Sequence, residues 1–62
     1  MELAHRIEGL AIGQAFADDM RAVLRVVVID PVTRVVEAES PMGEVFVDDI
    51  GHFWATHSPL GD

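Results

Sequence analysis

The stretch that decides the fold is residues 25–39, which read RVVVIDPVTRVVEAE. Residues 25–29 are mostly β-branched and the run is short, which is typical of a strand. Asp30 and Pro31 suit the first two positions of a type I turn. Residues 34–39 then form the returning strand, with charge on alternate positions toward its end. The stretch therefore predicts an antiparallel β-hairpin.

The residues before this hairpin, 2–25, predict an interrupted helix. Apolar residues recur there at helical spacing in two series that do not share one stripe. Gly9 and Gly13 lie at the break, and each costs a helix about 1 kcal/mol relative to alanine. A helix kinked near these glycines and a short segment followed by a helix from about Gln14 both fit the pattern. A strand over residues 3–12 stays open as an alternative, because the glycines weaken the helix there.

The residues after the hairpin predict a third strand and a short helix. Residues 40–43 contain a serine, a proline and a glycine and form a second turn, and residues 44–47 form a strand with Val45 and Val47 on its core face. Asp48 or Asp49 is suited to cap a short helix over Ile50–Thr56. Residues 57–62 are predicted to be a flexible tail. The predicted fold is α+β: one domain over residues 1–62, with the N-terminal helix packed on a three-stranded antiparallel sheet.

Composition excludes several classes of function. The 62 residues include 11 acidic and four basic ones, for a net charge of −7, and no cysteine. Binding to nucleic acid needs clustered Lys and Arg, so direct nucleic-acid binding is not expected. The absence of cysteine removes disulfides and thiolate metal sites. No apolar run approaches the length needed to cross a bilayer and no secretory leader is present, so we expect a cytoplasmic protein.

The balance of size and hydrophobicity predicts self-association. Half of the 62 residues are hydrophobic, which is more apolar surface than so small a core readily hides. The run at 26–29 is apolar on both strand faces, and Val26 and Val28 are predicted to share the face that a second copy covers. Gly9, Gly13 and Ala17 recur every four residues and would form a smooth dimer contact on a continuous helix. A turn that requires glycine is the alternative for the first two.

Acidic residues are concentrated in the second half of the chain. Residues 35–62 contain six acidic residues and no Lys or Arg. This asymmetry is compatible with a solvated surface that maintains solubility or with a face that binds a basic protein. Tryptophan is enriched at interface hot spots, although it more often completes a small core. The candidate partner-binding residues are Phe53, Trp54, Glu37, Glu39, Glu44, Asp48 and Asp49.

The sequence offers little for catalysis or for metal binding. It has no Gly-x-Ser-x-Gly motif, and a chain this short hardly encloses a substrate pocket. His52 and His57 are five residues apart, which places them on different faces of a helix or strand, and pairing of His52 with Asp48 or Asp49 is the simpler expectation. We therefore predict a non-enzymatic interaction module without a cofactor: a regulator, inhibitor or accessory subunit that occupies a protein surface. The alternative is a homo-oligomer that binds a small ligand or metal between subunits through these four residues.

Overall fold

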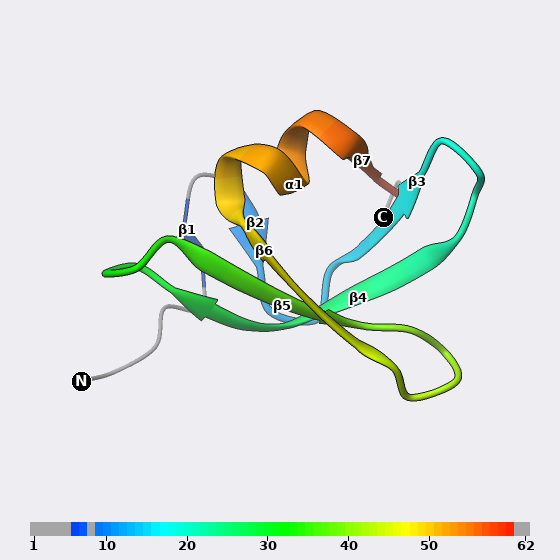
Figure 1. The fold of residues 1–62 in the computed structure, drawn as a ribbon, viewed down its shortest axis with the longest axis horizontal. Coiled ribbons are helices and arrows are strands. Elements are labelled where there is room, and N and C mark those ends of the chain that lie inside the picture. Colours follow the sequence, from blue (N-terminus) through cyan, green and yellow to red (C-terminus); the bar gives the residue numbers. More distant parts are fainter. Residues whose placement is uncertain (1–5, 8, 61–62) are drawn as a thin grey trace.

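The protein is a five-stranded antiparallel sheet with one short helix packed on it (Figure 1). The computed structural model describes residues 6–7 and 9–60. A separate two-stranded hairpin at the N-terminal side contains β1 (Arg6–Ile7) and β2 (Leu10–Ala11). The remaining elements are β3 (Ala15–Asp18), β4 (Val23–Asp30), β5 (Val35–Glu39), β6 (Val45–Asp49), α1 (Ile50–Thr56) and β7 (His57–Pro59).

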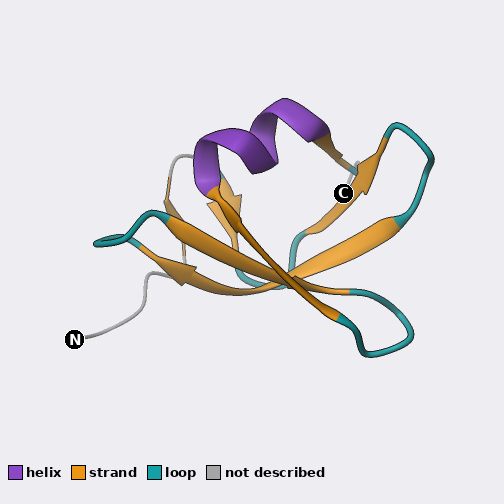
Figure 2. Cartoon of the chain, in the orientation of Figure 1, coloured by secondary structure: helices purple, strands orange, loops and turns teal. Residues whose placement is uncertain are grey.

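The order of the strands places β6 and β7 at opposite edges of the sheet. Strands β3 to β6 follow one another as antiparallel neighbours, and the full order is β6-β5-β4-β3-β7. Helix α1 follows the edge strand β6 in the sequence, crosses one face of the sheet and is followed by β7 at the opposite edge (Figure 2). The sheet is strongly twisted.

The predicted N-terminal helix packed on a three-stranded sheet is wrong, because the described residues form a five-stranded sheet and their helix lies near the C-terminal end. The segment 14–24 instead forms β3, a tight turn and the start of β4, and Phe16 is paired with Leu24 across the two strands. The Asp18 carboxylate accepts the N–H groups of Met20 and Ala22, which closes the turn between the strands. Two apolar residues eight positions apart fit one face of a helix, and they also fit a hairpin whose turn lies midway between them. The spacing of the apolar residues alone did not distinguish a helix from a hairpin.

The glycines of the predicted helix stripe belong to turns. Gly9, with φ of 86°, lies between β1 and β2, and Gly13, with φ of 88°, follows β2. Ala17 lies in β3, so the three residues do not form the continuous stripe from which a helix contact was predicted. The alternative reading of these glycines, as residues that a turn requires, is the correct one. The strand alternative for residues 3–12 agrees with β1 and β2, while residues 3–5 and 8 lie outside the described part.

The predicted hairpin at 25–39 is present as β4 and β5, with one irregularity that changes its faces. The register between the strands shifts between Val26 and Val28, which is a β-bulge. As a result Val26 and Ile29 are both buried in the core, whereas Val28 is half-buried on the opposite face. The prediction that Val26 and Val28 share a face is therefore wrong. The extra residue introduced by the bulge reverses which side chains of β4 face the core along the second half of the strand.

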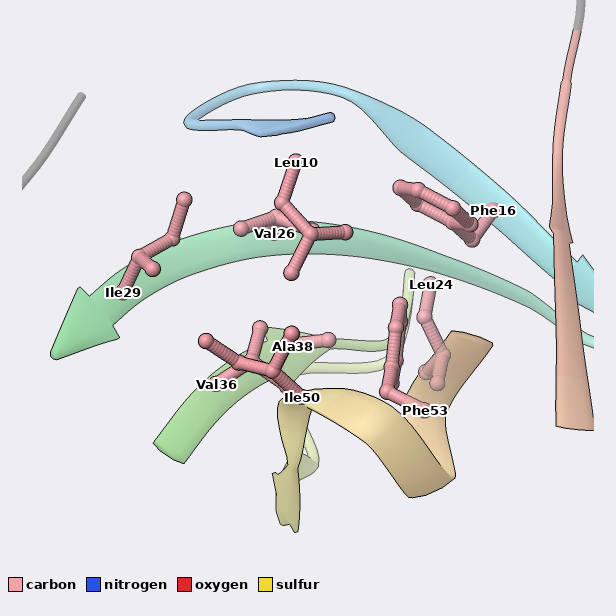
Figure 3. Packing of buried hydrophobic residues seen from close by; sticks show 9 residues of the cluster. All are labelled: Leu10, Phe16, Leu24, Val26, Ile29, Val36, Ala38, Ile50 and Phe53. Carbon is pink, nitrogen blue, oxygen red and sulfur yellow. The ribbon is translucent and has the colours of Figure 1, made fainter. Parts of the chain in front are cut away.

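The core is a single apolar cluster between the sheet and α1 (Figure 3). The ring of Phe16 meets the rings of Phe53 and Trp54 edge to face, at centroid distances of 5.0 and 5.2 Å. Edge-to-face contacts of this kind add to the free energy gained by burial. The cluster consists of Leu10, Phe16, Leu24, Val26, Ile29, Val36, Ala38, Ile50 and Phe53.

The structure of the second half of the chain agrees more closely with the prediction from the sequence. The short helix predicted over Ile50–Thr56 is present, and the side chain of Asp49 caps it by accepting the N–H of His52 at 3.2 Å. Residues His57–Pro59, predicted as part of a tail, pair with β3 as β7. The rest of the tail beyond residue 60 lies outside the described residues. Within the described part, no helix has the length and apolar character required to cross a membrane.

Replacement of Gly9 by alanine is expected to cost more stability than the same change at Gly13. Both glycines have positive φ, where an L-residue loses about 1 kcal/mol or more. A Cβ at Gly9 would also lie 3.2 Å from Cζ2 of Trp54, whereas a Cβ at Gly13 meets nothing within 4 Å. Urea unfolding of the two variants measures the difference. Equal losses would contradict the close packing of Trp54 on the β1–β2 turn.

Candidate functional site

An open groove of about 560 Å³ lies between β6 and the end of the β3–β4 hairpin. One wall is the end of the β3–β4 hairpin, including Val23 and Leu24, and the other is β6 with the turn before it, including Met42 and Phe46. The two turns that bound the groove lie on the same side of the molecule in Figure 1. Phe53 of α1 forms part of the floor. The volume of the groove is in the range of pockets that hold a few side chains or a small ligand.

The orientation of Phe46 explains why the groove is apolar. Phe46 is paired with Ala38 on β5, whose side chain is buried, so the two side chains share the core-facing side of the sheet. Even so, 49% of Phe46 is exposed, because β6 is an edge strand of the sheet that the described residues form. Met42, in the adjoining turn, is 89% exposed. The apolar surface of the groove is thus continuous with the core, and the groove itself is accessible to solvent.

Among the side chains that the structure describes, three carboxylates and no arginine line the groove, and Arg25 lies in an adjoining hollow. Asp18 accepts two backbone N–H groups at 2.9 Å through one oxygen. Asp48 accepts the N–H of Asp49 at 2.8 Å and contacts Nδ1 of His52 at 2.6 Å. These hydrogen bonds fix the positions of both carboxylates. Glu44 is the third acid of the groove and is exposed.

A histidine lies where β7 begins, beside the floor of the groove. The ring of His57 stacks on Phe53, with centroids 4.3 Å apart and an angle of 11° between planes. Its Nδ1 lies 2.8 Å from Oγ1 of Thr56 and 3.2 Å from the carbonyl oxygen of Phe53. His57 is also the cross-strand partner of Asp18. The groove therefore combines an aromatic floor with negatively charged borders.

The Asp48–His52 pair is expected to shift the titration of His52. The hydrogen bond that the His52 ring donates to Asp48, and then the charge of Asp48, raise the pKa of His52 above its ordinary value. A raised pKa means that this pair stabilises the fold below the ordinary pKa and that the contribution is lost as pH rises through the raised pKa. NMR titration of the His52 ring should show the raised pKa, and Asp48→Asn should lower it toward the ordinary value. Asp49→Asn is the matched control and should leave most of the shift, whereas equal effects of the two variants would contradict the assignment.

The predicted partner-binding residues occupy three different environments. Phe53 is buried and Trp54 is half-buried against the core, which agrees with the ordinary structural role of aromatic residues. Glu44 and Asp48 line the groove. The others lie elsewhere: Glu37 and Glu39 are on β5, opposite Val47 and Val45, and Asp49 caps α1.

Several residues of the groove were not predicted from the sequence. Asp18 and Val23 were assigned to the N-terminal helix, so they were not considered as residues of a binding site on the sheet. Val45 and Val47 were assigned to the core face of the third strand, but they are 52% and 63% exposed, and the residue between them, Phe46, faces the core side. A run of three apolar residues with no alternation was the available signal that both faces of this strand carry apolar side chains.

The residues of the predicted alternative metal site do not converge within one chain. His52 is paired with Asp48, and His57 is stacked on Phe53. Among residues 6–7 and 9–60, no group of three His, Cys, Asp or Glu side chains is close enough to hold a metal ion. His5 lies outside the described residues.

The comparisons with known proteins leave this groove as the main guide to function. No protein-family model, no curated protein and no solved structure matches the chain.

Proposed function

We propose that this protein is a small acidic, non-enzymatic interaction module that binds an apolar segment of a basic protein in the groove between β6 and the β3–β4 hairpin. The observation that carries the proposal is the exposure of Phe46, Met42 and Val47 along a groove that is also lined by three carboxylates. By binding there the module would act as a regulator, inhibitor or accessory subunit.

Two physical effects support binding at this site. Apolar surface removed from water contributes roughly 25 cal/mol per Å², so a partner that covers Phe46 and Met42 gains affinity from surface that is already exposed. The net charge of −7 attracts basic proteins over distances longer than a hydrogen bond and accelerates their association. The groove thus supplies affinity, and the charge of the whole chain favours one class of partner.

Site-specific photocrosslinking tests the proposal. p-Benzoylphenylalanine placed at Met42 lies at the groove, whereas the same group placed at Val32 lies in the β4–β5 turn and does not line it. Both side chains are exposed, at 89% and 66%, so Val32 is a matched control. In extracts of the source cells, we expect a single crosslinked protein from the Met42 position and none from Val32. Replacement of Phe46 by serine in the Met42 version should reduce its yield.

Other results would contradict the proposal. Crosslinking that is equal at the two positions would show nonspecific contact, and no product at either position would leave the groove without a partner. A product with twice the mass of the 6.8 kDa chain would place a second copy at the groove. That result would support the alternative, a homo-oligomer with a site between subunits.

A further inference from the structure

Strand β6 is an edge strand whose outward backbone is available for pairing. The hydrogen bonds from Ser40 N–H to Glu44 C=O and from Ile50 N–H to Arg34 C=O mark both ends of its ladder with β5. Because bonded positions alternate in antiparallel strands, Phe46 and Asp48 direct their backbone groups toward β5. The backbone groups of Val45 and Val47 therefore point away from the sheet, where the described residues include no further strand.

The side chains of β6 form a pattern that a complementary strand can match. Glu44, Phe46 and Asp48 alternate on the core-facing side and line the groove. Val45 and Val47 alternate with these residues, beside Glu39 and Glu37 of β5, respectively, and Val47 also contributes to the lining of the groove. From one end to the other, residues 44–48 thus read acidic, apolar, apolar, apolar, acidic.

This edge carries acidic charges, at Asp48 and Asp49, which oppose pairing with most strands but favour a basic one. Native edge strands are commonly shielded by lysine, proline or a bulge. Residues 45–49 contain no lysine and no proline, and the register between β5 and β6 is continuous. The groove beside the edge also leaves room for the side chain that a neighbouring strand would place opposite Phe46.

We infer that β6 binds an extended segment of the partner as a sixth, antiparallel strand, and that this segment has three apolar residues flanked by basic ones. This inference rests on the proposed function and specifies the partner for the same groove. The central apolar side chain enters the groove opposite Phe46, and the basic side chains lie opposite Glu44 and Asp48. Main-chain hydrogen bonds to Val45 and Val47 supply affinity, while the charges select the segment.

A second copy of the chain matches this edge poorly. The antiparallel register centred on Phe46 aligns the apolar residues of the two copies with one another. It also places Glu44 of each copy opposite Asp48 of the other, so like charges face each other at both ends. Each copy additionally carries a net charge of −7, which opposes association. Charge complementarity therefore favours a cationic strand over self-pairing.

A short synthetic peptide tests the pairing without altering the protein. The probe contains the core Lys-Val-Ile-Val-Lys with uncharged Gly-Ser flanks, and its Val residues lie opposite Val45 and Val47. Methylation of both Val amides removes the N–H groups that face β6. Methylation of the Ile amide, which points away from β6, is the matched control. Binding of each peptide to the ¹⁵N-labelled full-length protein is measured by NMR titration.

We expect the Val-methylated peptide to bind at least about tenfold more weakly than the parent and the Ile-methylated peptide to bind within about twofold of it. A probe in which both Lys are replaced by Glu should also lose binding. Equal weakening by the two methylations, a reversed order, or no binding of the parent peptide would overturn the inference. If these results occurred while the Met42 crosslink remained specific, the proposed function would stand and only the mode of binding would be wrong.

Discussion

Phe16→Ala is expected to unfold the protein. Phe16 is fully buried and contacts both other aromatic rings of the core, those of Phe53 and Trp54, edge to face. Removal of a buried phenylalanine side chain costs about 3–5 kcal/mol. The core of a domain this small rarely supplies more than about 3–5 kcal/mol of net stability. The substitution is therefore expected to remove all or most of the free energy of unfolding, and circular dichroism with urea titration measures it.

Phe46→Ala is the matched control for this result. It removes the same side chain from a position that is 49% exposed in the groove rather than from the core. The folded state should persist, because much of the lost surface is already in contact with water. If Phe46→Ala unfolded the protein and Phe16→Ala did not, the assignment of core and groove would be reversed.

Val26→Asp is expected to prevent folding, whereas Val28→Asp is expected to be tolerated. Val26 is fully buried, and no basic side chain belongs to the core cluster around it. An uncompensated buried charge costs about 3–5 kcal/mol, or the carboxyl must be protonated to avoid that cost. Val28 lies beyond the bulge on the other face, is half-buried and is paired with Glu37. Its aspartate variant keeps contact with water, and repulsion from Glu37 costs less than a buried charge, so the variant should lose much less stability.

Thermal unfolding of the two variants decides this prediction. A cooperative transition is expected for Val28→Asp and none for Val26→Asp. Similar behaviour of the variants would indicate a regular strand in which both residues share one face, and the register shift between them would then be wrong. The pair of substitutions therefore tests the bulge rather than the general importance of β4.

Local signals in the sequence predicted the β4–β5 hairpin and helix α1. The Asp30-Pro31 turn and the β-branched residues around it predicted the β4–β5 hairpin, in which Asp30 accepts the N–H groups of Val32 and Thr33. These two backbone hydrogen bonds also hold the pKa of Asp30 below its ordinary value. The cap at Asp49 likewise predicted α1. In each case one residue makes a short-range interaction that identifies the element.

The first half was mispredicted because its structure depends on long-range pairing. Phe16 and Leu24 have helical spacing, yet β3 is stabilised by β4 on one side and by β7, more than 30 residues later, on the other. No local signal reports a strand partner so distant in sequence. The glycines at 9 and 13 were the available indication, since both require positive φ and neither fits the interior of a helix.

The candidate site was only partly accessible to sequence reasoning for the same reason. Glu44 and Asp48 were identified from charge alone, and both line the groove. The opposite wall comes from residues 18–24, which the predicted helix had removed from the sheet. The availability of the β6 edge depends on the order of strands, and this order follows from the pairing of β7 with β3 rather than with β6.

Amide hydrogen exchange at β6 tests the central claim most directly. In the free protein, the amides of Val45 and Val47 should exchange quickly, whereas the amide of Phe46, which faces β5, should be protected. Saturation with the Lys-Val-Ile-Val-Lys peptide is predicted to slow exchange at Val45 and Val47 by at least about tenfold, because both amides become hydrogen bonded. Unchanged exchange at these two amides with the peptide bound would contradict strand addition at β6.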